Sequence, residues 1–240
     1  MSSTEHGAGG HHSGRSHVTL QAIRSRVQPG SFPLFLVASL FLYVLNGVAF
    51  ELPGRAILGR IVVAVAGLYV LSANRVTFWL AVLAVLSLIS FEARVWTLDP
   101  RVARVLQDAI MTGFLLWLLV VVLREVFRSA TTERDAVVGA LCGFLILLMV
   151  FTRVHGLIEA LNPDAYRTDG PPFSARSDAM LVSSFQYFST ITLTTVGFGD
   201  IVPVTPVARL ATGLEAIMGQ LYLAVVIATL VGRVAGARRE

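Results

Sequence analysis

Lysine is absent from this 240-residue chain, so that all 19 basic side chains are arginine, and cysteine occurs only once. The single cysteine, Cys142, excludes a disulfide within the chain and leaves the redox compartment unspecified. No basic cluster with interleaved aromatic residues is present, which argues against a nucleic-acid-binding surface. No nucleophile–base arrangement, phosphate-binding loop or cysteine–histidine cluster is evident either. The sequence therefore predicts neither an enzyme nor a protein with a resident cofactor.

Charged residues are also scarce. They make up 14% of the chain, whereas hydrophobic residues make up 55%, and an average soluble protein is about 25% charged. This composition predicts an integral membrane protein with most of its length in lipid. Residues 1–30 differ, because they are rich in histidine, serine and glycine and lack the apolar core of a signal peptide. We expect a disordered tail there, although its histidines could also bind a metal or sense protons.

Apolar segments of roughly 20 residues, the length that a bilayer requires, recur along the rest of the chain. Six of them predict transmembrane helices, at residues 31–50, 56–73, 76–98, 102–127, 136–161 and 206–234. A shorter segment, 178–193, follows a polar loop with three prolines and is too short to span the membrane together with the stretch after it. We expect a re-entrant helix there, which enters the membrane and turns back. The predicted fold class is an all-α membrane protein.

The stretch that follows the short helix has the sequence Thr194-Thr195-Val196-Gly197-Phe198-Gly199-Asp200. A dehydrated cation needs oxygen ligands on all sides, but successive carbonyls of an ordinary extended strand point to opposite sides. Alternate residues must therefore adopt left-handed dihedral angles, which Gly197 and Gly199 can do without a steric penalty. Val196 and Phe198 would then turn their side chains outward to pack against a supporting helix. Such neutral oxygen ligands suit a hard, weakly held ion that must also leave.

This stretch resembles the selectivity filter of the potassium channel family, and differs from its commonest version only by Phe198 in place of tyrosine. The resemblance implies that K⁺, as the permeant ion, is held by the carbonyls of Thr195, Val196, Gly197 and Phe198, with the Thr195 hydroxyl below them and Gly199 completing the filter. A glycine-rich turn between two helices is the structural alternative. One loop cannot surround an ion, so the resemblance implies a homotetramer around a central axis.

The resemblance also divides the chain as a bacterial-type channel with six transmembrane helices. It implies a peripheral four-helix domain at 31–128 and a pore domain at 136–234, with an outer helix at 136–161, a pore helix at 178–193, the filter at 194–200 and an inner helix at 206–234. In this family the aspartate end of the filter faces outside, which implies a multi-pass protein of the cell (inner) membrane with both termini cytoplasmic. The distribution of arginine agrees only modestly, because Arg94, Arg101 and Arg104 would lie outside.

Several residues are predicted to support the filter. In the resembled family, an aromatic donor on the pore helix ties down the filter aspartate. Of the two matching positions, only Tyr187 carries a hydroxyl, so we expect a hydrogen bond from Tyr187 to Asp200 rather than one from Phe188. Thr194, at the start of the filter, is also assigned to its support. Relatives that place a glutamate four residues before Thr195 have a carboxyl pair there, which Ile191 excludes here.

The predicted inner helix carries Glu215, an ionisable residue inside an apolar span, which is a candidate functional residue for that reason. We expect its carboxyl to support the filter from behind through a hydroxyl such as that of Thr190 or Thr192, or to be a protonated and satisfied structural group. Gly219 lies where the family has its gating hinge. The alternative for Gly219 is close packing against the small residues Gly139 and Gly143 of the fifth helix.

The fourth predicted span lacks the regular arginine series of a voltage sensor. Arg101 and Arg104 have the required spacing, but the series stops at Gln107, and Asp108 appears instead. Moving one charge through 100 mV supplies about 2.3 kcal/mol, and sensors use three or four charges per subunit. We therefore predict weak or absent voltage dependence and a peripheral domain that is largely uncharged.

Near the end of the fifth helix, His155 and Glu159 are four residues apart and could share a face as a metal or proton site, or form an ordinary interfacial hydrogen bond. A proton-coupled transporter that uses Asp108, Glu215 or His155 is one functional alternative, but no internal repeats are visible. A non-selective cation channel and a non-conducting partner subunit are others. The prediction is a passive K⁺-selective channel in the lipid bilayer, whose gating stimulus the sequence does not specify.

Overall fold

The computed structural model describes residues 31–48, 99–128 and 133–237. Over these residues the chain forms five α-helices, a 3-10 helix η2 (Phe173–Ala175) and two short strands. The helices are α2 (Ser31–Val48), α5 (Pro100–Arg128), α6 (Glu133–Leu161), α7 (Asp178–Leu193) and α8 (Pro206–Ala237). The N-terminal tail and the spans predicted at 56–73 and 76–98 lie outside the described residues.

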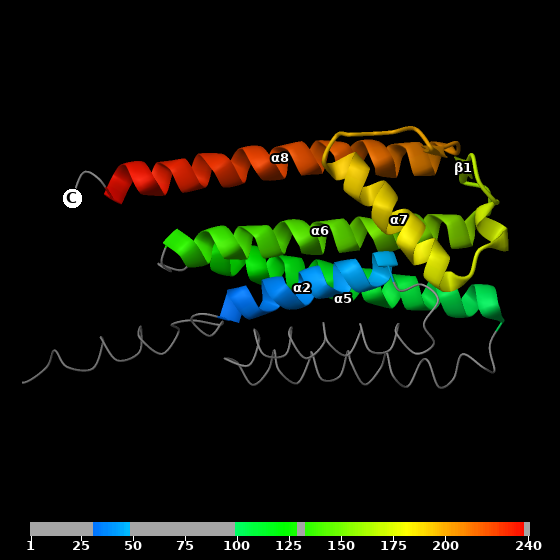
Figure 1. Ribbon diagram of the computed structural model, residues 1–240, viewed down its shortest axis with the longest axis horizontal. Helices are drawn as coiled ribbons and strands as arrows, with labels where there is room; N and C mark the ends of the chain where they lie inside the picture. The colour runs from blue at the N-terminus through cyan, green and yellow to red at the C-terminus, as the bar shows by residue number, and fades with distance from the viewer. Residues whose placement is uncertain (1–30, 49–98, 129–132, 238–240) are drawn as a thin grey trace, which may run out of the picture.

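The four longer helices α2, α5, α6 and α8 run along the long axis of the molecule, and α7 crosses them obliquely near one end (Figure 1). Two segments, Arg101–Arg124 of α5 and Ala136–Leu161 of α6, are long and apolar enough to cross a membrane. The start of α2 and the end of α8 lie at the same end of the bundle, opposite the strands (Figure 1).

Helix α5 begins at Pro100, and proline is favoured at the first position of a helix. The Asp99 carboxylate accepts hydrogen bonds from the backbone N–H groups of Arg101 (2.8 Å) and Val102 (3.4 Å), and Pro100 has no N–H that would need a partner. The helix then packs along α6, and α2 also packs against α6, so that the three helices share one apolar core. The fully or nearly fully buried members of this core include Phe35, Leu118, Val122, Cys142, Ile146 and Leu193. Two adjacent spans are thus joined along their length.

Helix α7 occupies the residues predicted for the short helix. Its N-cap is Ser177, whose hydroxyl accepts a hydrogen bond from the backbone N–H of Met180 (3.4 Å). The helix buries Leu181, Phe185 and Phe188 against the end of α6 and the start of α8. In Figure 1 it runs inward from the end of the bundle that holds the strands and stops at Leu193, partway along α8, and the chain then turns back toward the strands. This is the path expected of a re-entrant segment.

A two-stranded antiparallel sheet closes this end of the bundle. Strand β1 (Tyr166–Thr168) pairs with β2 (Ile201–Pro203) in the register Tyr166↔Pro203, Arg167↔Val202 and Thr168↔Ile201. The sequence predicts a polar loop at β1 and no strand after Asp200, so this sheet was not predicted. Three-residue strands carry too few positions for an alternating pattern to be visible. The sheet joins the segment after α6 directly to the segment that precedes α8.

Candidate functional site

The glycine-rich stretch between α7 and β2 has an unusual backbone. The φ angles are 60° at Thr195, 53° at Gly197 and 80° at Gly199. The left-handed conformations predicted for Gly197 and Gly199 are therefore confirmed. Thr195 extends the alternation to a third residue, one that pays a steric penalty of about 1–3 kcal/mol for this conformation. Such a strained residue persists only where its surroundings hold it in place.

The end of α7 holds the beginning of this stretch. The backbone N–H groups of Val196 and Gly197 both donate to the carbonyl oxygen of Ile191, at 2.8 and 3.1 Å. The Thr194 hydroxyl donates to the carbonyl of Thr190 (2.6 Å). The Ile191 carbonyl is one of those that lack a partner within the helix at its end, and the Thr190 carbonyl also accepts from the backbone N–H of Thr194 (3.1 Å). The conformation of the stretch is thus tied to the position of the last turn of α7.

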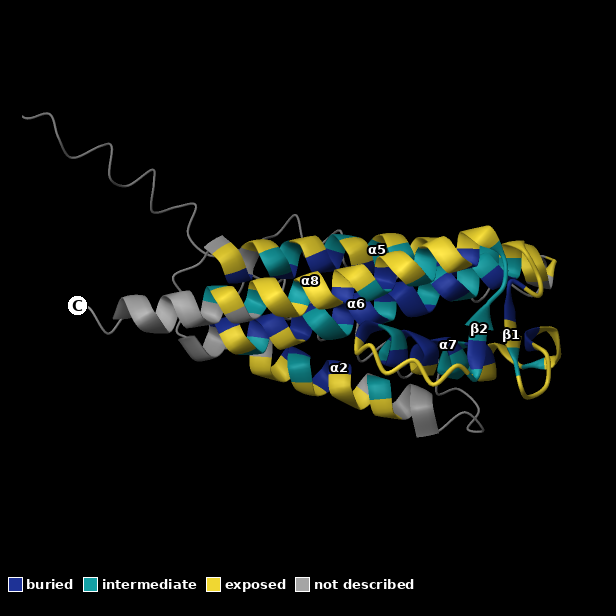
Figure 2. Cartoon of the chain, turned by 90° about the horizontal axis from the view of Figure 1, so that it is seen from above, coloured by how far each residue is buried: buried dark blue, intermediate teal, exposed yellow. Residues whose placement is uncertain are grey.

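The stretch is exposed in the single chain. All residues from Thr194 to Gly199 are exposed, with Val196 at 52% and Phe198 at 70% of their accessible surface. The prediction that these two side chains pack against a supporting helix is therefore wrong for an isolated chain. Much of α8 is also exposed (Figure 2). The exposed apolar members include Leu210, Leu214, Ile217, Met218 and Leu221.

At the far end of the stretch, Asp200 lies beside Tyr187 of α7. The pKa of the Tyr187 hydroxyl is raised, first by its partial burial. The hydrogen bond to the Asp200 carboxylate and the negative charge of that carboxylate raise it further. One carboxylate oxygen of Asp200, Oδ1, is buried and has no hydrogen-bond partner among the described residues. Phe188, the alternative aromatic position, is instead buried at 3% exposure in the apolar cluster behind α7.

Behind α7, Glu215 of α8 is completely buried and bonds to His155 of α6. The distance from His155 Nε2 to Glu215 Oε2 is 2.8 Å, and both side chains are 0% exposed. The other ring nitrogen, Nδ1, lies 2.6 Å from the hydroxyl of Tyr166 in β1. Neither Thr190 nor Thr192, which the sequence suggested as partners of Glu215, makes this contact. The three side chains therefore connect α6, α8 and β1.

Glu159 has a different role from the one suggested by its spacing from His155. Its Oε1 accepts from the backbone N–H of Asp164 (3.0 Å), and its Oε2 accepts from that of Tyr166 (3.3 Å). It therefore closes the turn after α6, where Asp164 has a φ angle of 67°. Among the described residues, no group of three or more histidine, cysteine or acidic side chains could hold a metal ion. The metal site considered for His155 and Glu159 has no further ligand in that part of the chain.

Gly219 is a point of close approach between α8 and α7. A methyl group at this position would lie 2.6 Å from the carbonyl oxygen of Leu193, the last residue of α7. The packing partner predicted for Gly219, the fifth helix, is thus replaced by the end of α7. On α6, Gly143 instead faces the hydroxyl of Tyr222, which donates to the carbonyl of Ala140. The sequence could not distinguish these partners, because small residues fit any close crossing.

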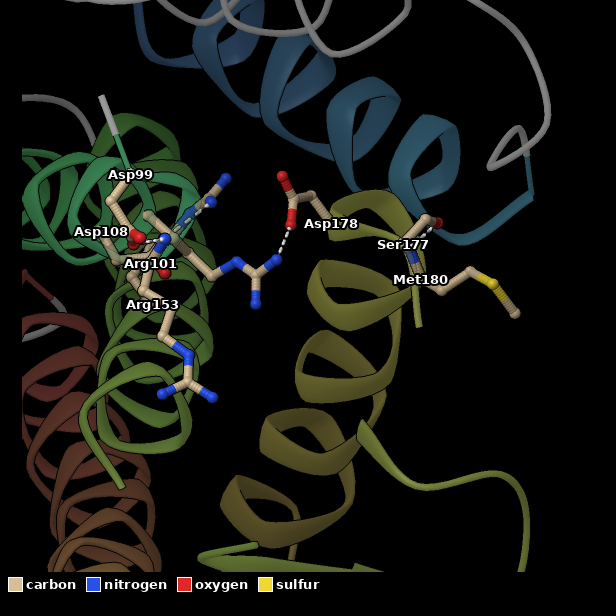
Figure 3. A network of polar contacts seen from close by, with 8 residues as sticks. Asp99, Arg101, Asp108, Arg153, Ser177, Asp178 and Met180 are labelled. Carbon is tan, nitrogen blue, oxygen red and sulfur yellow. Dashed lines mark hydrogen bonds and ion pairs between the residues drawn. The ribbon is translucent and has the colours of Figure 1, made fainter. Parts of the chain in front are cut away.

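Charged residues link α5 to the elements around the stretch. Arg104 pairs with Asp178, the first residue of α7, and Arg153 of α6 pairs with Asp108 at 3.2 Å (Figure 3). The second pair is mostly buried, with side chains that are 14% and 10% exposed. From the sequence, Asp108 is an interruption of the arginine series and a candidate proton-relay residue of a transporter, and no ion pair with Arg153 was predicted. Its partner could not be predicted, because Arg153 lies 45 residues away.

Comparison with known families gives a match over this part of the chain. Residues 166–235 match the model of a family described as an ion channel. The matched segment begins at β1 and includes α7, the glycine-rich stretch and nearly all of α8. Comparison with curated proteins gave no match. The family match and the apolar helices support a helical membrane protein with an ion channel domain, and a function other than catalysis.

Proposed function

We propose that the chain is one subunit of a potassium-selective channel that conducts K⁺ passively across a membrane. The observation that carries the proposal is the backbone at residues 195, 197 and 199, where left-handed conformations alternate with ordinary ones. It is supported by the position of this stretch at the end of a re-entrant helix and inside the segment that matches an ion channel. Alternation of this kind is the backbone geometry that aims successive carbonyls at one line.

In this proposal the ligands of the ion are main-chain oxygens. Thr195, Val196, Gly197 and Phe198 contribute carbonyls, Thr195 also contributes its hydroxyl, and Gly199 allows the last turn of the filter. These oxygens replace the water shell of K⁺ and bind it weakly enough for release. K⁺ is thus the transported ion and not a cofactor. Phe198 keeps an aromatic side chain at the position where an aromatic residue supports a potassium-selective filter.

A symmetric assembly follows from the exposure of the same stretch. One stretch offers oxygens from one side only, and a cation needs them on all sides. Four copies around an axis would supply them, and would also cover Val196, Phe198 and the exposed apolar residues of α8. The proposed assembly is therefore a homotetramer whose filter and inner helices meet at the centre.

Four residues are proposed to support the filter. Tyr187 holds Asp200 at its outer end, Thr194 bonds back to α7, and Glu215 acts from behind α7. Gly219 lets α8 pass close to the end of α7 at the position proposed for a gating hinge. These contacts are supported by the geometry of the single chain, and their effect on conduction is part of the proposal.

The proposed topology has six membrane spans in the cell (inner) membrane. Both termini lie in the cytoplasm. The start of α2 and the end of α8 lie at one end of the bundle (Figure 1), as this topology requires. Voltage dependence is proposed to be weak or absent, because the apolar length of α5 from 105 to 123 has no arginine. Arg104, near its start, is engaged by Asp178.

Recording from purified protein in planar bilayers tests the proposal. The reversal potential should follow the K⁺ gradient by about 59 mV for a tenfold ratio, remain unchanged by a pH gradient, and respond weakly to Na⁺. Gly197→Ala should abolish selective current, because alanine is strained at a φ angle of 53°, whereas Gly113→Ala on α5, with no atom within 4 Å of the added methyl, is the matched control. Equal Na⁺ and K⁺ currents would indicate a non-selective cation channel. A reversal potential set by the pH gradient would indicate a proton-coupled transporter, and no current would indicate a partner subunit.

A further inference from the structure

His155, Glu215 and Tyr166 form a buried polar chain in surroundings that are otherwise aromatic. The imidazole ring of His155 is ringed by three phenylalanines, Phe151, Phe185 and Phe188, whose centroids lie 6.2, 6.3 and 5.0 Å away. Both ring nitrogens are engaged, one by the Glu215 carboxylate and one by the Tyr166 hydroxyl. A polar chain inside an apolar core is costly unless every member is satisfied, so its retention calls for a specific role.

The direction of the hydrogen bonds follows from the chemistry of the two ends. Burial, and then the charges of Glu215 and Glu159, raise the pKa of Tyr166, so that its hydroxyl remains protonated and donates to Nδ1 of His155. The opposite nitrogen, Nε2, then carries the ring proton and donates to Glu215 Oε2. Tyr166 thus fixes the tautomer of His155, and His155 in turn fixes the orientation of the Glu215 carboxyl group.

The Glu215 carboxylate also interacts with α7. The Ser189 hydroxyl interacts with the Glu215 carboxylate, and Ser189 is 0% exposed. Neither Ser189 Oγ nor Glu215 Oε1 makes a hydrogen bond of ordinary geometry among the described residues. A serine hydroxyl can rotate to donate to a carboxylate oxygen, so each group supplies the hydrogen-bond partner that the other lacks. The polar chain therefore ends on the helix that precedes the filter.

Ser189 lies within the last turns of α7, two residues before Ile191. The carbonyl of Ile191 holds the N–H groups of Val196 and Gly197, so a displacement of this turn is transmitted directly to the filter backbone. Gly219 of α8 lies against Leu193 at the end of the same turn. Because Glu215 is one helical turn before Gly219, the polar contact and the close contact fix the same part of α7 on α8.

We propose that His155 is a positioning residue for conduction, which holds the Glu215 carboxylate against Ser189 so that α7 keeps the filter in its conducting conformation. This inference rests on the proposed function. It adds residues outside α8, His155 of α6 and Tyr166 of β1, to those that support the filter. Its members lie on four elements: α6, α8, β1 and α7. An ordinary structural role for the same residues would affect the stability of the protein without affecting ion selection.

The test measures the Na⁺/K⁺ permeability ratio and the rate of current decay in planar bilayers, for variants that purify as the wild-type oligomer. Ser189→Ala removes only the hydroxyl and should raise the permeability ratio or the decay rate about tenfold, as expected for the loss of one hydrogen bond to a charged group. Glu215→Leu and His155→Leu should do the same. Glu215→Gln keeps an acceptor for His155 and a polar group for Ser189, and should restore both quantities to within about threefold of the wild type.

The matched control is Thr152→Val on α6, which removes a buried hydroxyl whose one bond among the described residues goes to the carbonyl of Leu148 in its own helix. This variant should conduct as the wild type does. If the leucine variants fail to assemble, Ser189→Ala and Glu215→Gln still carry the test. A wild-type protein that selects K⁺, with a Ser189→Ala variant that matches it in both measurements, overturns this inference alone. A wild-type protein without K⁺ current overturns the proposed function and this inference together.

Discussion

Arg104 near the start of α5 forms an ion pair with Asp178, the first residue of α7 (Figure 3). The pair joins α5 to the beginning of α7. Both side chains are accessible, at 33% and 74% exposure, and such pairs contribute at most about 1 kcal/mol. Asp178 also lies at a helix N-terminus, where its charge is favourable without a partner.

Arg104→Gln is therefore expected to change the free energy of unfolding by less than about 1 kcal/mol. It is also expected to leave the voltage dependence of the current unchanged, because this arginine is held outside the apolar length of α5. Conductance–voltage curves of the wild type and the variant in one lipid composition measure the second effect. A change in the slope of the curve would show that Arg104 moves in the field and contradict the prediction.

The pair between Asp108 and Arg153 is a stronger case, because both side chains are mostly buried between α5 and α6. Asp108→Ala leaves an unpaired buried guanidinium and should destabilise the protein by about 3–5 kcal/mol. The double variant Asp108→Leu with Arg153→Met replaces the pair by apolar groups and should regain most of that loss. Thermal unfolding in detergent, monitored as the loss of the oligomer with temperature, compares the two variants. Equal losses in the single and double variants would rule out this account.

Gly219→Ala and Gly213→Ala on α8 should have opposite effects. At Gly219 the added methyl group meets the Leu193 carbonyl at 2.6 Å, so helix α7 must shift, at a cost of about 1–3 kcal/mol. At Gly213 the methyl group has no atom of the same chain within 4 Å, and helix propensity should add up to about 1 kcal/mol of stability. Unfolding temperatures measure both. A destabilised Gly213→Ala variant would instead indicate a close contact with a second subunit at this position.

The contact between Tyr187 and Asp200 predicts a dependence on alkaline pH. The pKa of Tyr187 is raised above its usual value of 10.0, so the hydroxyl remains a donor below that value and its contribution is lost as the pH rises through the raised pKa. Above that point a phenolate and a carboxylate face each other, and the current should decay faster. Recordings at increasing external pH should show this step in the wild type and not in Tyr187→Phe. A step of the same size in both proteins would assign it to another group.

The elements around the candidate site were largely predictable from the sequence, because their limits are set by local chemistry. Asp99 and Pro100 start α5, Ser177 starts α7, and the glycines at 197 and 199 give the backbone its alternation. The partners of the polar residues were not predictable. The spacing of His155 and Glu159 suggested a pair, but His155 bonds to Glu215, 60 residues away, and Glu159 caps a turn. Such choices depend on how helices cross, which no short pattern encodes.

The pairing of β1 with β2 has a consequence for how a channel built from this chain would open. The strand that follows the filter is tied to the segment leaving α6, and not to α8 alone. In the proposed channel, the outer end of the filter is therefore held by the segment after α6 as well as by α8. In such a channel, the half of α8 that lies far from the strands could move and widen the entrance at that end. The filter and its ion-binding carbonyls would keep their positions.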